Sequence, residues 1–498
     1  MKKVSTGILL IAALIIAILA TEPFIVDYPA GHFGWVSLHS LAIAKNTRID
    51  NFLVGYTCNY DGFLNYFSRY PIFFNLATKF LLKPFEANSA LHLYLSRQLM
   101  NIIYISTVYV LFLIAKNLLS SDTKALAATI LSSTGFMILR YKNMYHFDQP
   151  GLLAFLVFIL ILSKHNLIEL NRNRGKFLLA TALLSMVGRC YIIVFGCLVW
   201  LALEILKKLN IGKNFKSTDF NLKLPFFALF TSSFTIGINI FFNILIEAHI
   251  NHTSILNTSV VASAVKRLGL NQDFNIEKKQ ALGTIQFSIE QFKRFSSNFI
   301  PESMVDVYSS LRILIMITLV LLLGYVLRLL FIEFISNKDP HRSAQAKIQI
   351  ILFSTGPIWL FVMKNLSAFH PYTAIYYIGT YLILWIFLLN SIQKKAVYRL
   401  VLFLVTGLFV VSLFRVKQLN VVITNPINYS SLDKYAQVLN AEHAPTVYVE
   451  GGHRNFIENS PYALCYFLPL SQLVDSIESA DYVLEQSEIN GYMLEKRK

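Results

Sequence analysis

The chain has 498 residues, of which 55% are hydrophobic and 14% are charged, and its formal net charge is +16. A soluble domain carries roughly 25% charged residues, so the composition excludes an ordinary soluble protein. Most lysines and arginines lie in short loops between apolar runs, where positive charge orients membrane helices. The basic balance therefore indicates membrane topology and no nucleic-acid partner.

Eleven apolar runs have lengths that suit the helices of a multi-pass membrane protein. We predict an all-α polytopic membrane protein with about 11 transmembrane helices. The first run follows Met1-Lys-Lys and resembles a signal peptide, but its poor cleavage site favours an uncleaved helix. The predicted spans are 5–24, 92–115, 124–140, 150–164, 176–188, 190–206, 222–246, 310–335, 347–364, 372–390 and 399–415.

The fifth and sixth runs are short and meet at Gly188-Arg189, so they form either one long helix or a hairpin of two. Loop charge favours the hairpin, because with eleven spans and an inside N-terminus every inside loop is positive. This topology places three long segments on the outer face, at 25–91, 247–309 and 416–498. The predicted domains are thus a transmembrane domain over 1–415 and an outer C-terminal α/β domain over 416–498.

The first outer segment opens with Glu22-Pro-Phe-Ile-Val-Asp27-Tyr-Pro-Ala-Gly-His32-Phe-Gly-Trp35, where two prolines and two glycines stop the preceding helix. Ionisable groups at a membrane surface are costly to place and tend to be functional. Asp27 is therefore the first candidate catalytic residue. His32 either lines a cavity or anchors a helix in the interface.

Three stretches of the outer segments have helical spacing. Gly31 to Asn46 is predicted to be an amphipathic helix, and 70–83 a second helix whose aromatic face lies in the membrane interface. A third apolar stripe is typical of either a core-facing or an interfacial helix; its members are Ile285, Ile289, Phe292, Phe295 and Phe299. In the tail, 432–439 is helix-like, whereas 446–450 and 482–485 have strand patterns.

The second acidic site is Arg140-Tyr-Lys142-Asn-Met-Tyr-His146-Phe-Asp148-Gln-Pro150, between the third and fourth spans. Asp148 just before Pro150 fits the cap of the following helix. The charged residues and the histidine gathered here exceed what a cap needs. They suit an anionic head group or a shared metal ion.

Two further outer turns carry polar groups. Arg189, at the tip of the short hairpin, needs an anionic partner, which is either a carboxylate of this protein or a lipid phosphate. The turn from Lys364 through His370 to Tyr372 indicates a polar pocket. A carboxylate that accepts a proton from an attacking hydroxyl, together with cations for a departing phosphate, is the chemistry needed to displace a phosphate leaving group.

On these motifs the chain resembles the GT-C superfamily of membrane glycosyltransferases, which includes protein O-mannosyltransferases and aminoarabinose transferases. The resemblance rests on Asp27 after the first span, the long first outer loop with interfacial helices, the His146-Phe-Asp148 motif and the outer C-terminal domain. It implies a multi-pass enzyme of the bacterial inner membrane whose active site faces the periplasm. Such an enzyme transfers a hexosyl or pentosyl unit from a polyprenyl-phosphate carrier, with inversion, to a hydroxyl of a lipid, glycan or protein.

The resemblance also implies roles for single residues. Asp27 matches the general base, and Asp148, with His146, matches the second acidic motif. Asp148 is thus the second catalytic candidate, and His146 is a substrate-binding candidate. Many members have Asp-x-Asp or Glu-x-Asp where this chain has His-Phe-Asp, so no cofactor is predicted and the need for a divalent metal stays open. The remaining substrate-binding candidates come from their positions in the sequence and not from the resemblance; they are His32, Arg189, Lys364, His370 and Tyr372.

Two other functions fit a polytopic protein with these features. A glycan polymerase or ligase also uses lipid-linked donors, but its chemistry usually lies in a large outer loop late in the chain, whereas the acids here come early. A lipid or glycan transporter or flippase often shows inverted repeats and broken helices at the midplane. This sequence has no repeat, and its polar residues gather at one face, which favours the transferase.

Overall fold

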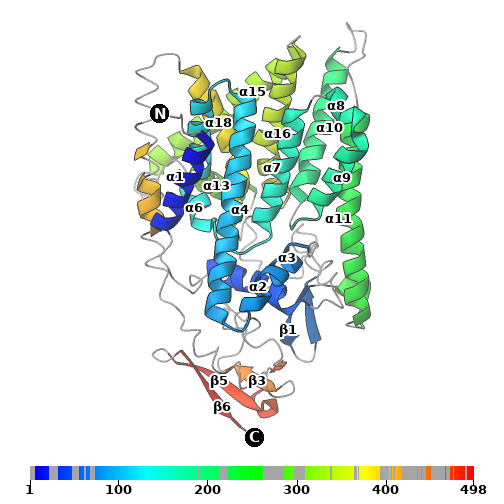
Figure 1. Cartoon of the computed structure of the whole chain (residues 1–498), viewed down its shortest axis with the longest axis vertical. Coiled ribbons are helices and arrows are strands. Elements are labelled where there is room, and N and C mark those ends of the chain that lie inside the picture. The colour runs from blue at the N-terminus through cyan, green and yellow to red at the C-terminus, as the bar shows by residue number, and fades with distance from the viewer. Residues whose placement is uncertain are drawn as a thin grey trace.

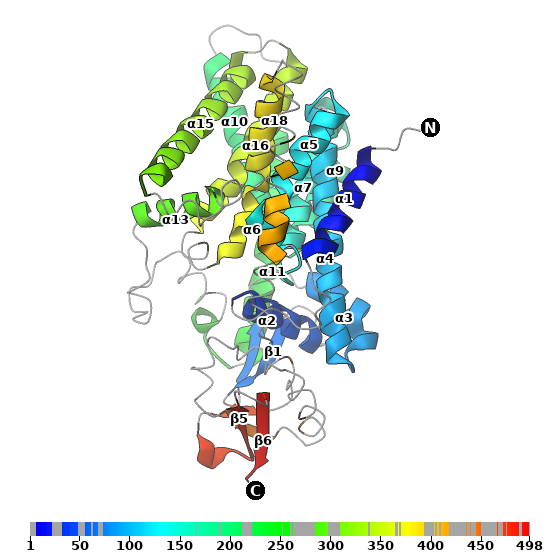
Figure 2. The same ribbon diagram turned by 90° about the vertical axis from the view of Figure 1, so that its left-hand side faces the viewer.

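The computed structural model is a helical bundle with a small β-sheet at one end (Figure 1). Seen from the side, the long helices run roughly along the same axis, and the C-terminal strands lie beyond their ends (Figure 2). We call this end the sheet end of the bundle. The structure describes residues 6–21, 32–47, 55–60, 63–67, 73–165, 167–188, 191–211, 222–250, 252–258, 261, 284–296, 309–336, 339–363, 367, 370–392, 403, 406–407, 410–417, 435, 439, 445–449, 466, 472–474, 476–487 and 491–497.

The described helices follow the predicted spans closely. Four of them are long and apolar enough to cross a membrane, at Ser89–Leu118, Lys223–Ile250, His341–Val362 and Pro371–Ser391, and Thr6–Ala20 is a shorter apolar helix. The predicted span at 399–415 lies largely outside the described residues. The bundle helices are α1 (Thr6–Thr21), α4 (Ser89–Leu118), α5 (Asp122–Ser133), α6 (Phe136–Tyr141), α7 (Asp148–Lys164), α8 (Leu167–Arg172), α9 (Arg174–Ser185), α10 (Tyr191–Ile211), α11 (Lys223–Ile250), α15 (Ser309–Ser336), α16 (Pro340–Val362) and α18 (Ile378–Ser391), the last preceded by the 3-10 helix η3 (Pro371–Tyr377).

The predicted third span is wrong in one respect, because it consists of two helices. α5 ends at Ser133 and α6 begins after Gly135. The hydroxyls of Ser133 and Thr134 donate to backbone carbonyls one turn back, at 2.7 and 2.6 Å. Such bonds compete with the helical ladder and bend or end helices.

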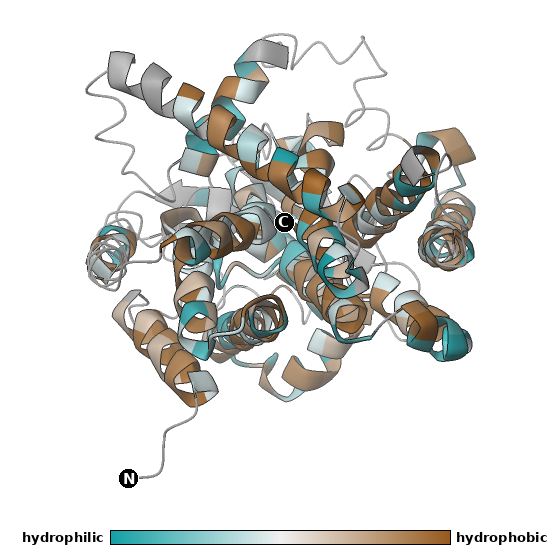
Figure 3. Ribbon diagram, turned by 90° about the horizontal axis from the view of Figure 1, so that it is seen from above, coloured by the Kyte–Doolittle hydropathy of each residue, from teal (hydrophilic) through white to brown (hydrophobic). Residues whose placement is uncertain are grey.

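The fifth and sixth spans are separate helices, as loop charge predicted. α9 ends at Ser185, and Gly188 in the turn after it has a φ of +62°. Glycine adopts this helix-ending conformation readily, whereas other residues rarely do. Both α9 and α10 pack on α7 and α11. Seen from above, hydrophobic residues predominate on helices all round the bundle (Figure 3). On the outermost helices they are exposed, as a lipid-facing surface requires: Phe230 of α11 is 57% exposed.

Two short helices cover the sheet end. The predicted amphipathic character of α2 (His32–Asn46) is wrong: residues on every face between Val36 and Ala44 are buried, because α3 and the first strand pack against it. α3 (Phe73–Leu82) buries Asn75 and Thr78 and exposes Phe80 and Leu81. This apolar outer face suits the predicted interfacial position.

The third predicted stripe is partly wrong. α13 (Thr284–Ser296) buries Phe287, Gln291 and Phe295, whereas Ile289 is 38% exposed. Phe299 lies outside the described residues. The buried face is therefore shifted from the predicted one and carries a glutamine at its centre.

One mixed sheet joins the first outer segment to the tail. The hairpin strands β1 (Gly55–Tyr60) and β2 (Phe63–Phe67) come from the former, and β3 (Thr446–Val449), β4 (Gln472–Val474), β5 (Tyr482–Ser487) and β6 (Gly491–Lys496) from the latter. The strand order is β2-β1-β4-β3-β5-β6, with β4 parallel to β1 and β3. β3 and β5 form where the strand patterns predicted them. The sheet therefore crosses the predicted boundary at 415/416.

Candidate functional site

The acidic motif between the third and fourth predicted spans forms a buried turn. α6 ends at Tyr141 and α7 begins at Asp148, and every residue from Tyr141 to Pro150 is buried. The Gln149 side chain donates a hydrogen bond to the Tyr141 carbonyl, which ties the two ends of the turn together. Phe147 in this turn packs with Ile43 of α2, so the turn lies towards the sheet end.

The Asp148 carboxylate binds two side chains. Its Oδ1 accepts a hydrogen bond from the Tyr376 hydroxyl at 2.6 Å, and its Oδ2 lies 2.8 Å from Nδ1 of His146. Asp148 is fully buried and is the first residue of α7, whose N-cap position is Phe147. It therefore lies in the first turn of the helix, and its carboxylate contacts side chains from beyond that turn as well.

Aromatic rings surround this carboxylate. The His146 ring lies 4.8 Å from that of Tyr372 and 5.1 Å from that of Phe147, between centroids. The His370 ring lies 5.1 Å from that of Tyr372, between centroids. Four residues that the sequence analysis singled out, namely His146, Asp148, His370 and Tyr372, thus gather in one place.

η3 brings the tyrosines here because α16 lets it approach closely. A Cβ added at Gly356 of α16 would lie 2.0 Å from the Tyr376 carbonyl oxygen, and one at Gly379 would lie 2.6 Å from that of Leu352. The Trp359 ring packs on Tyr376 at 4.3 Å between centroids. The sequence analysis missed Tyr376, which stands in an apolar run; its only signal is the polar hydroxyl at membrane depth.

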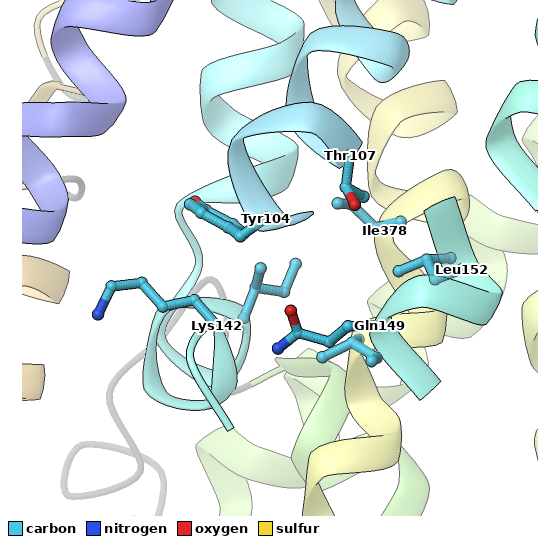
Figure 4. A pocket seen from close by; sticks show the side chains of 8 residues that line it. Tyr104, Thr107, Lys142, Gln149, Leu152 and Ile378 are labelled. Carbon is cyan, nitrogen blue, oxygen red and sulfur yellow. The ribbon is translucent and has the colours of Figure 1, made fainter. Parts of the chain in front are cut away.

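A small cavity lies next to this turn, and Lys142 and Gln149 of the turn line it (Figure 4). The Gln149 amide points towards its middle, whereas the Lys142 ammonium points away. Its walls are largely apolar, from Tyr104, Thr107, Ile138, Leu152, Ile375 and Ile378. We interpret it as a packing void behind the site rather than as a substrate pocket.

Basic side chains from three helices gather around Tyr466 of the tail. The Lys45 ammonium donates to the Tyr466 carbonyl at 3.0 Å and lies 4.3 Å from its ring centroid, and the Lys79 ammonium donates to the Lys45 carbonyl at 2.6 Å. The Tyr466 hydroxyl lies 2.7 Å from Nδ1 of His92. Burial lowers the pKa of Lys79 from its ordinary value. The sequence analysis missed this cluster because its members are far apart in the chain.

Three predicted site residues lie outside the described residues: Asp27, Arg189 and Lys364. His32 begins α2, but its side chain is not described either. The meeting of Asp27 with Asp148 therefore stays a prediction.

Within the described ranges, no three His, Cys, Asp or Glu side chains come close enough to hold a metal ion.

Comparison with known protein families and with curated proteins gives no match. Among solved structures, the chain is similar to the archaeal oligosaccharyltransferase AglB from Archaeoglobus fulgidus, in complex with an inhibitory peptide and a dolichol-phosphate, with 11% identity and a TM-score of 0.53 over 96% of this chain and 69% of that one. It is also similar to ArnT from Cupriavidus metallidurans bound to undecaprenyl phosphate, with 12% identity and a TM-score of 0.56 over 95% of this chain and 87% of that one.

These similarities confirm the predicted resemblance at the level of the fold. The chain is a helical membrane protein whose fold is similar to those of AglB and ArnT. At such low identity these similarities assign no activity to the chain. An activity has to be argued from the residues of the site.

Proposed function

We propose that this chain is an inverting glycosyltransferase that moves a hexosyl or pentosyl unit from a polyprenyl-phosphate carrier to a hydroxyl group. The acceptor is a lipid, a glycan or a protein on the outer, periplasmic face of the bacterial inner membrane. One observation carries the proposal: a fully buried carboxylate, Asp148, contacts a histidine and a tyrosine towards the sheet end of the bundle. The fold supports it, since the similar structures hold dolichol-phosphate and undecaprenyl phosphate.

The proposed reaction is one displacement at the anomeric carbon. The acceptor oxygen attacks that carbon, and the bond to the phosphate oxygen breaks with its electron pair staying on the phosphate. Asp27 takes the proton of the acceptor hydroxyl. Asp148 and His146 form the second catalytic group, and the donor phosphate binds Arg189, Lys364 and His370. His32 and Tyr372 line the substrate site.

The basic cluster around Tyr466 fits this arrangement. Lys45 and Lys79 hold positive charge next to α3, whose apolar outer face suits the membrane interface. A lipid phosphate at the membrane surface would meet these cations before it reached Asp148.

A transfer assay tests the proposal. The purified protein is reconstituted with a panel of undecaprenyl-phosphate-linked hexoses and pentoses and with an envelope extract as acceptor source, and released undecaprenyl phosphate is measured by mass spectrometry. We expect release with the wild type and a loss of about 10²-fold to 10⁴-fold for Asp27→Asn.

Asp122→Asn is the matched control, because this aspartate is half-exposed at the start of α5 and pairs with Lys116 at 3.0 Å, away from the site. We expect it to keep wild-type release. Full release by Asp27→Asn would overturn the proposal.

A further inference from the structure

We infer that His146 is the member of the His146–Asp148 pair that meets the reacting atoms, as a cation for the departing phosphate, and that Asp148 is a positioning residue. This inference rests on the proposed function and assigns the work of its second catalytic group.

The contacts of Asp148 point to a positioning role. Its side chain is fully buried, where a charge is costly unless it is paired and hydrogen-bonded. Tyr376 donates to one oxygen, and His146 lies against the other. A carboxylate held on both oxygens by protein groups is poorly placed to take a proton from a substrate.

The same contacts fix the state of His146. Its Nδ1 lies 2.8 Å from Oδ2 of Asp148 and 3.4 Å from the Asp148 backbone nitrogen. Because the contact with the carboxylate is the shorter one and is charge-assisted, we assign a proton to Nδ1, and this N–H donates a hydrogen bond to the carboxylate. The carboxylate beside Nδ1 favours the doubly protonated, cationic ring, whereas burial of the ring opposes the charge, so the cation depends on Asp148 as its partner.

The ring is also held in place. Tyr372 and Phe147 pack against His146, and η3, which carries Tyr372 and Tyr376, lies in close backbone contact with α16 through Gly356. A hydrogen-bond donor whose orientation is fixed before the reaction requires little reorganisation free energy during it. Titratable groups in contact with this pair include Tyr372 and Tyr376, and the His370 ring packs on Tyr372.

The chemistry follows from where charge develops. When the bond from the anomeric carbon to the phosphate oxygen breaks, the electron pair adds a negative charge to the phosphate. An imidazolium that donates a hydrogen bond there stabilises this charge, while the acceptor's proton goes to Asp27. Asp148 compensates the cation, so the buried ring stays charged between turnovers. No proton of His146 is consumed.

Binding of undecaprenyl phosphate tests the inference without knowledge of the sugar. Affinities of the purified protein in nanodiscs are measured for undecaprenyl phosphate and for undecaprenol, between about pH 5.5 and pH 8.5, the range in which an ordinary histidine titrates. At the acidic end we expect His146→Gln to weaken undecaprenyl phosphate binding by about tenfold to a hundredfold, because glutamine keeps a donor but loses the charge. Undecaprenol binding should not change.

The pH dependence separates a charged role from a structural one. The affinity ratio of wild type to His146→Gln should shrink as pH rises through the pKa of the His146 imidazole. Asp148→Asn should lose its affinity for undecaprenyl phosphate at a lower pH than the wild type does. The ratio cancels the titration of the phosphate itself. The matched control is His165→Gln, because His165 makes a similar Nδ1 contact with Glu169 at 3.3 Å but is half-exposed after the end of α7.

Three results decide the matter. Equal binding by His146→Gln and wild type, or a ratio that does not vary with pH, would overturn the inference and leave the proposed function standing. A wild type that does not prefer undecaprenyl phosphate to undecaprenol would overturn the proposed function as well. If His146→Gln does not fold, the pH profiles of wild type and Asp148→Asn decide: the variant must lose affinity at a lower pH than the wild type, and coincident profiles refute the inference.

Discussion

The contact between Gly356 and η3 offers a sharp test of how the bundle holds the site. A Cβ at position 356 would lie 2.0 Å from the Tyr376 carbonyl oxygen, whereas ordinary contact begins at 3.4 Å. In Gly356→Ala the two backbones must therefore separate by about 1.4 Å, since backbone cannot rotate away as a flexible side chain does. Because Tyr376 is on the segment that must move, its hydroxyl is displaced with it.

The displacement breaks the hydrogen bond to Asp148. The Tyr376 hydroxyl lies 2.6 Å from Oδ1, and a shift of this size takes it beyond hydrogen-bonding distance. Overpacking costs about 1–3 kcal/mol, and loss of a bond to a charged group costs about 1.5–3 kcal/mol. We expect Gly356→Ala to lower the unfolding temperature in detergent and to reduce undecaprenyl phosphate affinity.

Gly324→Ala is the matched control. Gly324 is inside α15, where an added Cβ meets nothing within 4 Å, and alanine is preferred over glycine in a helix by about 1 kcal/mol. This variant should keep or raise the unfolding temperature and keep wild-type affinity. If Gly356→Ala matches Gly324→Ala in both measurements, the reasoning that close backbone contact holds Tyr376 on Asp148 is refuted.

Three further changes test other parts of the fold. Gly188→Ala should lower the unfolding temperature, because it combines a φ of +62° with a Cβ 2.6 Å from the Phe147 carbonyl; Gly237→Ala, in open space, should not. Lys347→Met leaves the buried Glu204 carboxylate without the ammonium 2.7 Å away and should lower the free energy of unfolding by about 3–5 kcal/mol. If the loss comes from the unpaired charge, adding Glu204→Leu should restore most of that free energy. Gln291→Leu removes the acceptor of the Tyr377 hydroxyl at 3.1 Å and should speed proteolysis near α13. The control is Gln286→Leu at an exposed position of α13, and equal proteolysis rates for the two variants would contradict a stabilising contact between Gln291 and Tyr377.

The long helices were predictable because their apolar runs are long and their loops are charged. Hydropathy and loop charge did not predict the break after Ser133, because it depends on hydrogen bonds from hydroxyls to the backbone, which neither signal reports. α2 was misjudged for a related reason. Periodicity predicted an amphipathic helix, but Ser37 and Ser40 are fully buried along with the apolar residues of α2, which packs against α3 and the first strand.

The candidate site was predictable only where polar residues stood out against apolar surroundings. His146, Asp148, His370 and Tyr372 were singled out in this way, and the structure places them together. Tyr376 was not, because a tyrosine inside an apolar run resembles any core aromatic residue until its partner is known. Its role depends on the packing of η3 against α16, which no local pattern encodes.

The site is held mainly by backbone packing from two sides. Gly188 lets its turn meet the carbonyl of Phe147, directly before Asp148, and Gly356 lets α16 meet that of Tyr376, the donor to Asp148. Both approaches involve main-chain atoms, which have little freedom to adjust. The carboxylate is therefore fixed between two segments whose positions are set by helix packing rather than by a ligand. It follows that the His146–Asp148–Tyr376 geometry exists before any substrate arrives, as a preorganised charge-stabilising site requires.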